Sequence, residues 1–139
     1  DSCSKNEVKK IINITTIRSL EDNKDTSIAT TEESMLALNE KVIPFDMWSA
    51  KADQLFLNHK ANMDTVSLHL GAVIGPEDNI ISPMGNFFIS FLKGNLKMIP
   101  EGGYPWISID DVLKITEKCL KKRPQFNRYI IAKEWISLP

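Results

Sequence analysis

Few residues of this chain have side chains whose types and spacing could do chemistry, and they form no familiar metal motif. His59 and His69 cannot hold a metal ion by themselves, and the sequence has no HExxH motif or Cys/His cluster. Cys3 and Cys119 lie far apart and form no CxxC pair, which predicts the absence of a disulfide framework and favours a reducing, cytoplasmic setting. We expect Cys119 to act as a small apolar residue on a buried helix face.

Two further patterns have structural rather than chemical interpretations. Asp110 and Asp111 are adjacent carboxylates on a predicted strand-to-helix turn, where neighbouring side chains point apart, so we expect a helix cap there. Gly71 and Gly75 are spaced as GxxxG at the end of a predicted strand. The sequence has neither a GxxGxxG turn nor a GxxxxGK[ST] loop, the two glycine-rich motifs that cradle phosphates.

The composition is that of one globular domain. The chain has 139 residues, of which 42% are hydrophobic and 25% are charged, enough to bury a core. The net charge of −1, with Lys and Arg scattered, argues against a nucleic-acid partner. No apolar run approaches the roughly 20 residues of a membrane span, and the N-terminus lacks the apolar core of a signal peptide. Since the sequence lacks an initiator Met, we expect a fragment or a processed product.

Strands and helices are predicted to alternate along the chain, which favours a parallel α/β sheet. We expect residues 1–8 to be a helix end or loop and residues 18–44 to be a long loop with a helical turn at 32–38. The expected strands are 9–16, 66–70 continued by 72–74, 96–99, 105–109 and 128–132; the expected helices are 46–61, Ser82–Pro83 to Gly94, and Asp110 or Asp111 to Pro124, with Ser137 capping a further helix. The small number of strands indicates part of a larger sheet.

Each predicted helix carries an apolar face. The apolar residues of the three helices, in chain order, are Trp48, Ala52, Leu55 and Phe56; Met84, Phe87, Phe88, Phe91 and Leu92; and Val112, Ile115, Cys119 and Leu120. We expect the phenylalanines of the second helix to belong to the core or to a substrate-side wall.

Four stretches in a fixed order carry a resemblance to a known family. They are KKIINITT (9–16), MWSAKADQ (47–54), LHLGAVIGP (68–76) and GGYPWISIDDV (102–112), followed by RYIIAKEWISL (128–138). Together they resemble the extended short-chain dehydrogenase/reductase superfamily, or NAD-dependent epimerase/dehydratase family, in its dihydroflavonol-reductase-like branch. The resemblance implies an α/β fold: the C-terminal part of a Rossmann-like, doubly wound parallel sheet plus the small substrate-side region. Residues 1–139 would be one partial domain, without the N-terminal half that grips the dinucleotide.

The resemblance also implies site residues. In the family a Tyr acts as general acid/base, a Lys four residues on lowers its pKa and binds the nicotinamide ribose, and a Ser or Thr hydrogen-bonds the reacting oxygen. Lys51 and Thr16 match the last two positions, whereas Met47 stands at the Tyr position and has no proton to transfer. The implied cofactor contacts are Lys51, Leu70, Gly71 and Val73, with NAD or NADP bound only when the missing half is present. His69-Leu70 replaces the usual Arg-Pro.

The function implied is that of an NAD(P)-dependent oxidoreductase or epimerase-like protein acting on a small carbonyl or alcohol, impaired by Met47. The alternative is a non-catalytic relative that serves as a binding or scaffolding module, and a third interpretation is an unrelated α/β domain with accidental similarity. Structural roles remain open for each site residue: Lys51 as a solvated charge, Thr16 as a structural hydroxyl, Met47 as a packed side chain and His69 as a packed strand histidine.

The expected partners follow from the same resemblance. In the family's topology the strand at 9–16 pairs with a strand of the missing half, so its open edge would be apolar and prone to association. The family also uses the helix at 46–61 in a dimeric four-helix contact, which favours a homo-oligomer or association with the missing half. We expect no membrane and no nucleic-acid partner.

Overall fold

The computed structural model describes residues 2–22, 29–39, 43–58, 63–76, 82–96 and 102–137. The strand expected at 96–99 lies outside these residues apart from Leu96, as does the end of the helix expected at 46–61 beyond Asn58.

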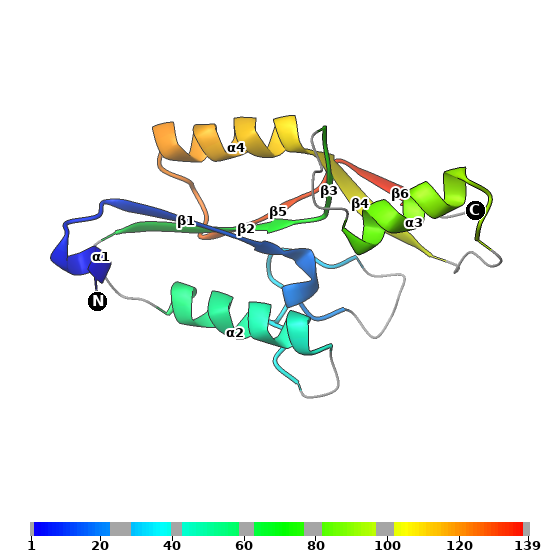
Figure 1. The fold of residues 1–139 in the computed structure, drawn as a ribbon. Coiled ribbons are helices and arrows are strands. Elements are labelled where there is room, and N and C mark those ends of the chain that lie inside the picture. Colours follow the sequence, from blue (N-terminus) through cyan, green and yellow to red (C-terminus); the bar gives the residue numbers. More distant parts are fainter. Residues whose placement is uncertain are drawn as a thin grey trace.

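The main sheet has three parallel strands in the order β1-β2-β5, as the α/β pattern predicts. They are β1 (Lys10–Thr16), β2 (Asp64–Leu70) and β5 (Arg128–Ile131), and Ile14 of β1 pairs with Leu68 of β2. Helix α4 (Ile109–Lys121) covers one face of this sheet and α2 (Pro44–Leu57) covers the other (Figure 1). Helices on both faces are typical of a doubly wound fold.

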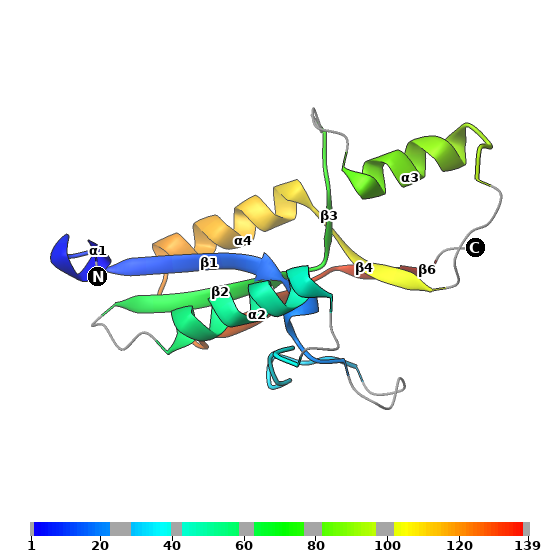
Figure 2. The same cartoon turned by 60° about the horizontal axis from the view of Figure 1, so that its bottom comes forward.

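A second sheet branches from the first at Gly71. It consists of β3 (Ala72–Ile74), β4 (Gly103–Ser108) and β6 (Glu134–Ser137), with β3 parallel and β6 antiparallel to β4, and α3 (Pro83–Leu92) lies beside it. Figure 2 shows β3 leaving the direction of β2 at a steep angle. A Cβ atom on Gly71 would lie 2.2 Å from the Pro105 carbonyl oxygen, so this crossing requires glycine.

One sequence-based expectation for the chain segments outside the main sheet is wrong, and one concerns residues that the structure does not describe. Ser137 ends strand β6, which was not predicted from the sequence, and the helix that Ser137 was expected to cap would lie outside the described residues. Residues 32–38 contain no helix; they form a turn followed by an isolated bridge between Leu36 and Leu20. The expected helix end at the N-terminus is the short α1 (Ser2–Lys5), and a 3₁₀ turn, η1 (Ile17–Ser19), follows β1.

The ends of helices α3 and α4 show which of the predicted capping residues cap a helix. Ser82 caps α3 as predicted, accepting a 3.0 Å hydrogen bond from the Gly85 N–H, and Gly94 follows the helix with a φ of 67°. The expectation that Asp110 or Asp111 caps α4 is wrong, because Ser108 is the N-cap and its Oγ accepts from the Asp111 N–H at 3.1 Å. Both carboxylates instead lie in the first turn, where they suit the helix dipole.

The hydrophobic core lies between the main sheet and α4. Its buried members are Val66, Leu68, Ile107, Val112 and Ile131, with further apolar side chains packed around them, including Ile115 and Cys119. Cys119 therefore has the packed position expected for it, whereas Leu120 is exposed.

The apolar face predicted for the helix at 46–61 does not pack on the sheet. Trp48 and Leu55 are exposed, while the residues that α2 buries are Asp46, Ala50 and Asp53. The reason is the alternation of β2, whose Val66 and Leu68 belong to the core while Ser67 and His69 contact the α2 side. A polar sheet face selects the polar face of the helix.

Candidate functional site

Thr16 ends β1, at the carboxyl edge of the main sheet. Its Oγ1 accepts the backbone N–H of Arg18 at 3.3 Å and thereby caps η1. A hydroxyl group that accepts one hydrogen bond still has its own hydrogen to donate. The position is therefore compatible with the structural role and with donation to a reacting oxygen.

A two-bond ion pair ties η1 to the start of α2. Arg18 donates from Nε to Asp46 Oδ1 at 2.9 Å and from Nη2 to Asp46 Oδ2 at 2.8 Å, and Asp46 is buried. The hydrogen bond to Asp46 raises the pKa of Arg18 above its ordinary value. Since Asp46 directly precedes Met47 and Arg18 follows Thr16 by two residues, the pair holds the first turn of α2 against the end of β1.

Met47 and Lys51 lie one turn apart on α2. Met47 is partly buried and Lys51 is exposed, with its Nζ atom 4.8 Å from the centre of the Trp48 ring. At that distance the ammonium group makes a cation–π contact with the indole. The structure thus brings the predicted Thr16 and Met47 positions to one end of the main sheet and leaves Lys51 open to solvent.

Beneath α2 the structure contains a buried polar cluster centred on Asp53. The carboxylate accepts hydrogen bonds from Ser67 Oγ and, at 2.9 Å, from Asn13 Nδ2; His69 Nε2 lies 3.3 Å from its Oδ2. Arg128 Nη2 lies 3.9 Å from the same Oδ2 atom. One carboxylate therefore connects α2 with β1, β2 and β5.

The cluster extends to the backbone of Thr16. Ser19 Oγ contacts His69 Nδ1 at 3.0 Å and donates to the Thr16 carbonyl oxygen at 2.7 Å. Serine, histidine and aspartate in this order match a nucleophilic triad. However, Ser19, His69 and Asp53 are all 0% exposed, so no substrate reaches the hydroxyl, and the series acts as a structural support for the end of β1.

The charge on Asp53 is stabilised in place. Burial alone would raise the pKa of this carboxyl, but the contact with His69 and the hydrogen bonds from Ser67 and Asn13 outweigh burial and lower the pKa below its ordinary value. The role expected for His69, a packed strand histidine, is confirmed by its complete burial.

Leu70, Gly71 and Val73 occupy three different environments. Leu70 ends β2 and packs against the hydrophobic core, and Gly71 donates its N–H to the Ile131 carbonyl oxygen at 3.0 Å. Val73 is partly exposed on β3 and lines a cavity. Of these three predicted cofactor contacts, Val73 is the one whose side chain faces an open space.

Sequence reasoning missed Asp53, Asn13 and Ser67. A signal was present: polar residues at every second position of two otherwise apolar strands, Asn13 and Thr15 on one and Ser67 and His69 on the other. Asp46, Ala50 and Asp53 at i, i+4 and i+7 mark the matching helix face.

Among the described residues, no group of three His, Cys, Asp or Glu side chains could hold a metal ion, and no helix is long and apolar enough to cross a membrane.

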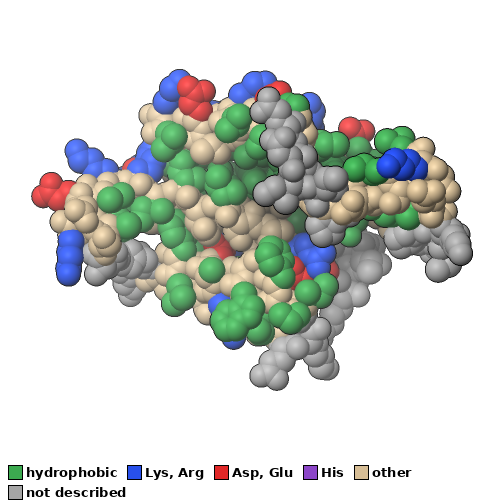
Figure 3. All heavy atoms as spheres, viewed as in Figure 1, with side chains coloured by type: hydrophobic (Ala, Val, Ile, Leu, Met, Phe, Trp, Pro, Cys, Tyr) green, Lys and Arg blue, Asp and Glu red, His purple; other side chains and the backbone are tan. Residues whose placement is uncertain are grey.

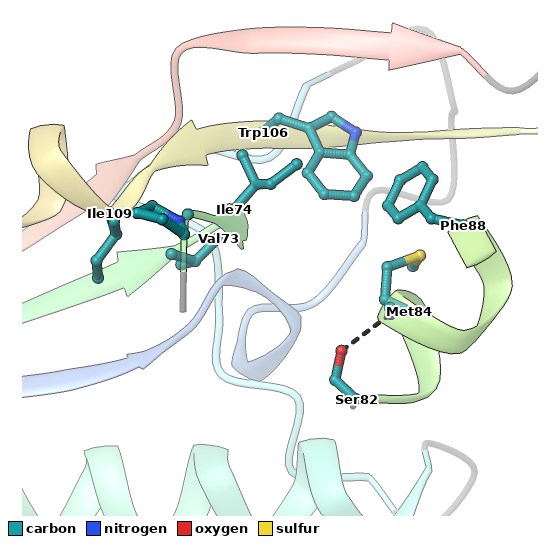
Figure 4. A pocket seen from close by; sticks show the side chains of 10 residues that line it. Val73, Ile74, Ser82, Met84, Phe88, Trp106 and Ile109 are labelled. Carbon is teal, nitrogen blue, oxygen red and sulfur yellow. Dashed lines mark hydrogen bonds between the residues drawn. The ribbon is translucent and has the colours of Figure 1, made fainter. Parts of the chain in front are cut away.

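A cavity of about 340 Å³ lies where β3, α3 and β4 meet. Figure 4 shows Val73 and Ile74 of β3 on one side of it, Met84 and Phe88 of α3 on the other, and Trp106 of β4 facing Phe88. The centres of the Phe88 and Trp106 rings are 5.4 Å apart.

Comparison with known proteins gives a consistent picture of the fold. No protein-family model and no curated protein sequence matches the chain. Solved structures do match it. Gox2253 has a TM-score of 0.84 and 21% sequence identity, over 99% of this chain and 42% of that chain. A nucleoside-diphosphate-sugar epimerase from Pseudomonas aeruginosa has a TM-score of 0.82 and 14% identity, over 99% of this chain and 45% of that chain. The yeast methylglyoxal/isovaleraldehyde reductase Gre2, complexed with NADPH, also matches, with a TM-score of 0.70 and 19% identity over 98% of this chain and 46% of that chain.

These neighbours are extended short-chain dehydrogenase/reductase structures, and the chain spans less than half of their length. The structure therefore confirms the predicted fold class: this chain resembles the C-terminal part of that Rossmann-like fold, with its main parallel sheet and its smaller second sheet.

Proposed function

We propose that this chain is the C-terminal, substrate-side part of an NAD(P)-dependent oxidoreductase or epimerase-like protein that acts on a small carbonyl or alcohol compound in the cytoplasm. The whole of residues 1–139 would be one partial domain, and a preceding half would grip the dinucleotide. The observation that carries the proposal is the Arg18–Asp46 ion pair, which holds the Thr16 end of β1 against the Met47 turn of α2.

In this proposal Thr16 hydrogen-bonds the reacting oxygen and Lys51 binds the nicotinamide ribose, with Val73 and the Leu70-Gly71 backbone bordering the nicotinamide. The cofactor would supply the hydride chemistry. The exposure of Lys51 supports this role, because a Lys that awaits a cofactor must not be committed to a buried partner. Met47 occupies the general acid/base position and transfers no proton.

The Met47 side chain gives a direct test of the proposal. In the full-length protein, Met47→Tyr should raise the rate of NADH- or NADPH-dependent reduction of small aldehydes by about 10²- to 10⁴-fold, the usual contribution of a positioned acid/base group. Met35→Tyr is the matched control, because the Met35 side chain is 74% exposed and lies outside α2, and it should leave the rate unchanged. Absence of turnover in the native protein and in both variants, together with absence of nucleotide binding, would overturn the proposal.

A non-catalytic relative is the second candidate, and the partly buried, proton-free Met47 favours it. Binding of NADH or NADPH to the full-length protein without turnover, even with Met47→Tyr, would select this binding or scaffolding role. Lys51→Ala should then weaken nucleotide binding, whereas Lys118→Ala, an exposed lysine on α4, should not.

We also propose that the protein associates through two surfaces. In the described part of the chain β1 pairs with β2 alone, and Figure 3 shows hydrophobic side chains exposed between β1 and α4; Ile14 and Leu113 are exposed apolar residues of these elements. This edge would receive a strand of the missing half.

The second surface is the outer face of α2, where Phe45, Trp48 and Leu55 are exposed. We propose that two copies pack these faces together. Sedimentation velocity of the full-length protein should show a dimer that Leu55→Glu dissociates and Leu92→Glu, an equally exposed site on α3, leaves intact. A native monomer would contradict the proposed dimer.

A further inference from the structure

The cavity between β3, α3 and β4 has a lining whose chemistry selects among ligands. Its side chains are almost wholly apolar, contributed by Val73, Ile74, Pro76, Met84, Phe88, Trp106 and Ile109, with glycines at two further positions. Ligand pockets of roughly 300–1,000 Å³ are usually apolar with a few polar groups that fix orientation. At about 340 Å³, this cavity falls at the small end of that range.

Two side chains of the described lining carry a hydrogen-bond donor, the indole N–H of Trp106 and the hydroxyl of Ser82. Ser82 Oγ accepts from the Gly85 N–H at 3.0 Å, as the dashed line in Figure 4 marks, and so keeps its hydroxyl hydrogen for another acceptor. A carbonyl or alcohol oxygen of a ligand is such an acceptor.

The aromatic side chains form the inner wall of the cavity. The Phe88 and Trp106 rings are tilted by 53° to each other, and Trp106 is 8% exposed. Gly75 brings β3 close to α4 there, because a Cβ atom at this position would lie 2.3 Å from Ile109 Cγ2. Val73 and Ile74, by contrast, are 42% and 54% exposed, so the β3 side of the cavity is open to solvent.

The groups that line the cavity disfavour one large class of ligand. The described lining residues include no Lys or Arg. A nucleoside diphosphate carries negative charge that proteins bind with Arg, Lys or a helix N-terminus. The α3 N-terminus at the cavity offers it few donors, because Pro83 has no N–H and the N–H groups of Gly85 and Asn86 already donate to Ser82.

We infer that this cavity binds the organic part of an uncharged, largely apolar carbonyl or alcohol compound, with one aromatic ring or a branched aliphatic chain, and not a nucleotide-linked sugar. The inference rests on the proposed function, because it treats the cavity as the substrate end of that site. Ser82 orients the ligand's oxygen-bearing end, and Phe88 and Trp106 bury its apolar body.

The test uses 3-phenylpropan-1-ol as an uncharged probe that forms no imine with lysine, and UDP-glucose as the competing class. In a full-length Trp48→Phe/Trp135→Phe background, Trp106 becomes the fluorescent reporter within residues 1–139. The alcohol should change its emission saturably, and UDP-glucose should neither reproduce the change nor reduce it.

A charge introduced at the open side supplies the matched comparison. Ile74→Lys places an ammonium group at the cavity and should weaken binding of the alcohol by about ten-fold or more. Leu92→Lys, at an 82% exposed residue of α3 outside the lining, should leave binding unchanged. Since Ile74 is itself 54% exposed, the substitution is compatible with folding, which circular dichroism would verify.

Displacement of the alcohol by UDP-glucose, or equal binding by the two lysine variants, would overturn the inference. Saturable binding that Ile74→Lys abolishes, in a protein that transfers no hydride to any aldehyde, would instead overturn the proposed function and leave the ligand class standing. Hydride transfer without binding of the alcohol would overturn the inferred ligand class and leave the proposed function standing.

Discussion

The Nε2 atom of His69 lies 3.3 Å from Oδ2 of Asp53, and neither side chain has surface in contact with solvent. The contact joins the central strand β2 to helix α2 through a charge, in a layer where most α/β proteins use apolar side chains. The same carboxylate receives Asn13 and Ser67, so its removal would leave several buried donors without an acceptor.

Asp53→Asn should therefore destabilise the protein strongly. Breaking one partner of a buried ionic cluster typically removes about 3–5 kcal/mol, because the remaining groups stay buried without compensation. We expect the free energy of unfolding to fall by about 3 kcal/mol in urea titrations. Asp110→Asn, at an exposed carboxylate in the first turn of α4, should lower it by about 1 kcal/mol or less.

The lowered pKa of Asp53 predicts the direction of one pH effect. A carboxyl whose folded-state pKa lies below its unfolded value binds fewer protons when folded, so its stabilisation is present above the unfolded pKa, near 3.8, and is lost as pH falls through the folded value. The difference in unfolding free energy between the native protein and Asp53→Asn should therefore shrink as the pH falls below about 4.

This difference isolates Asp53 from other acidic groups. Asp111 also has a lowered pKa, through its hydrogen bond with Ser108 and the nearby lysines, but it is present in both proteins and cancels. A difference that grows as the pH falls below 4 would contradict the assigned role of the Asp53 charge.

The sequence predicted those elements whose local signals agree with their tertiary surroundings. The β-branched run forms strand β1 (Lys10–Thr16), although its side chains are only partly buried and Ile14 is exposed. Ser82-Pro83 with Gly94 bounds α3 within two residues. Such signals act through φ/ψ preferences and capping bonds, which need no distant partner.

The sequence-based predictions failed where contacts with residues far away in the sequence determine the structure. The strand Glu134–Ser137 was not predicted, and it forms by antiparallel pairing with β4. Trp48 and Leu55 mark the most apolar face of α2, yet the sheet presents Ser67 and His69, so Asp53 turns inward. A one-dimensional hydrophobic pattern cannot show that a charged residue will face Asn13, Ser67 and His69 of the sheet.

Lys10 links the start of β1 to the end of α4 and gives a prediction with a neighbouring control. Its Nζ atom donates to the carbonyl oxygens of Cys119 at 2.7 Å, Leu120 at 3.0 Å and Lys122 at 2.9 Å. A cation there satisfies carbonyl groups that α4 leaves unpaired and interacts favourably with the helix dipole.

Lys10→Met should lower the free energy of unfolding by about 1–2 kcal/mol, since methionine keeps the apolar stem but loses hydrogen bonds to a charged group. Lys9→Met removes an equal charge from the adjacent exposed residue and should change it by less than about 0.5 kcal/mol. Amide hydrogen exchange should locate the loss in the last turn of α4; uniform loss across the sheet would contradict this assignment.

The Arg18–Asp46 ion pair allows the positioning of the candidate site to be tested apart from overall stability. Lys at position 18 keeps the charge but cannot make two parallel hydrogen bonds to the buried carboxylate. Arg18→Lys should therefore lower the free energy of unfolding by about 1 kcal/mol, a modest value because the Arg18 side chain is 45% exposed.

Hydrogen exchange should show a larger effect close to the ion pair than in the rest of the protein. Backbone amides of η1 and the first turn of α2 should exchange about ten-fold faster, while those of β2 keep their protection. Arg123→Lys, at the exposed pair with Asp64, is the control and should alter neither. Unchanged exchange in η1 and α2 would show that the ion pair does not hold Thr16 and Met47 together.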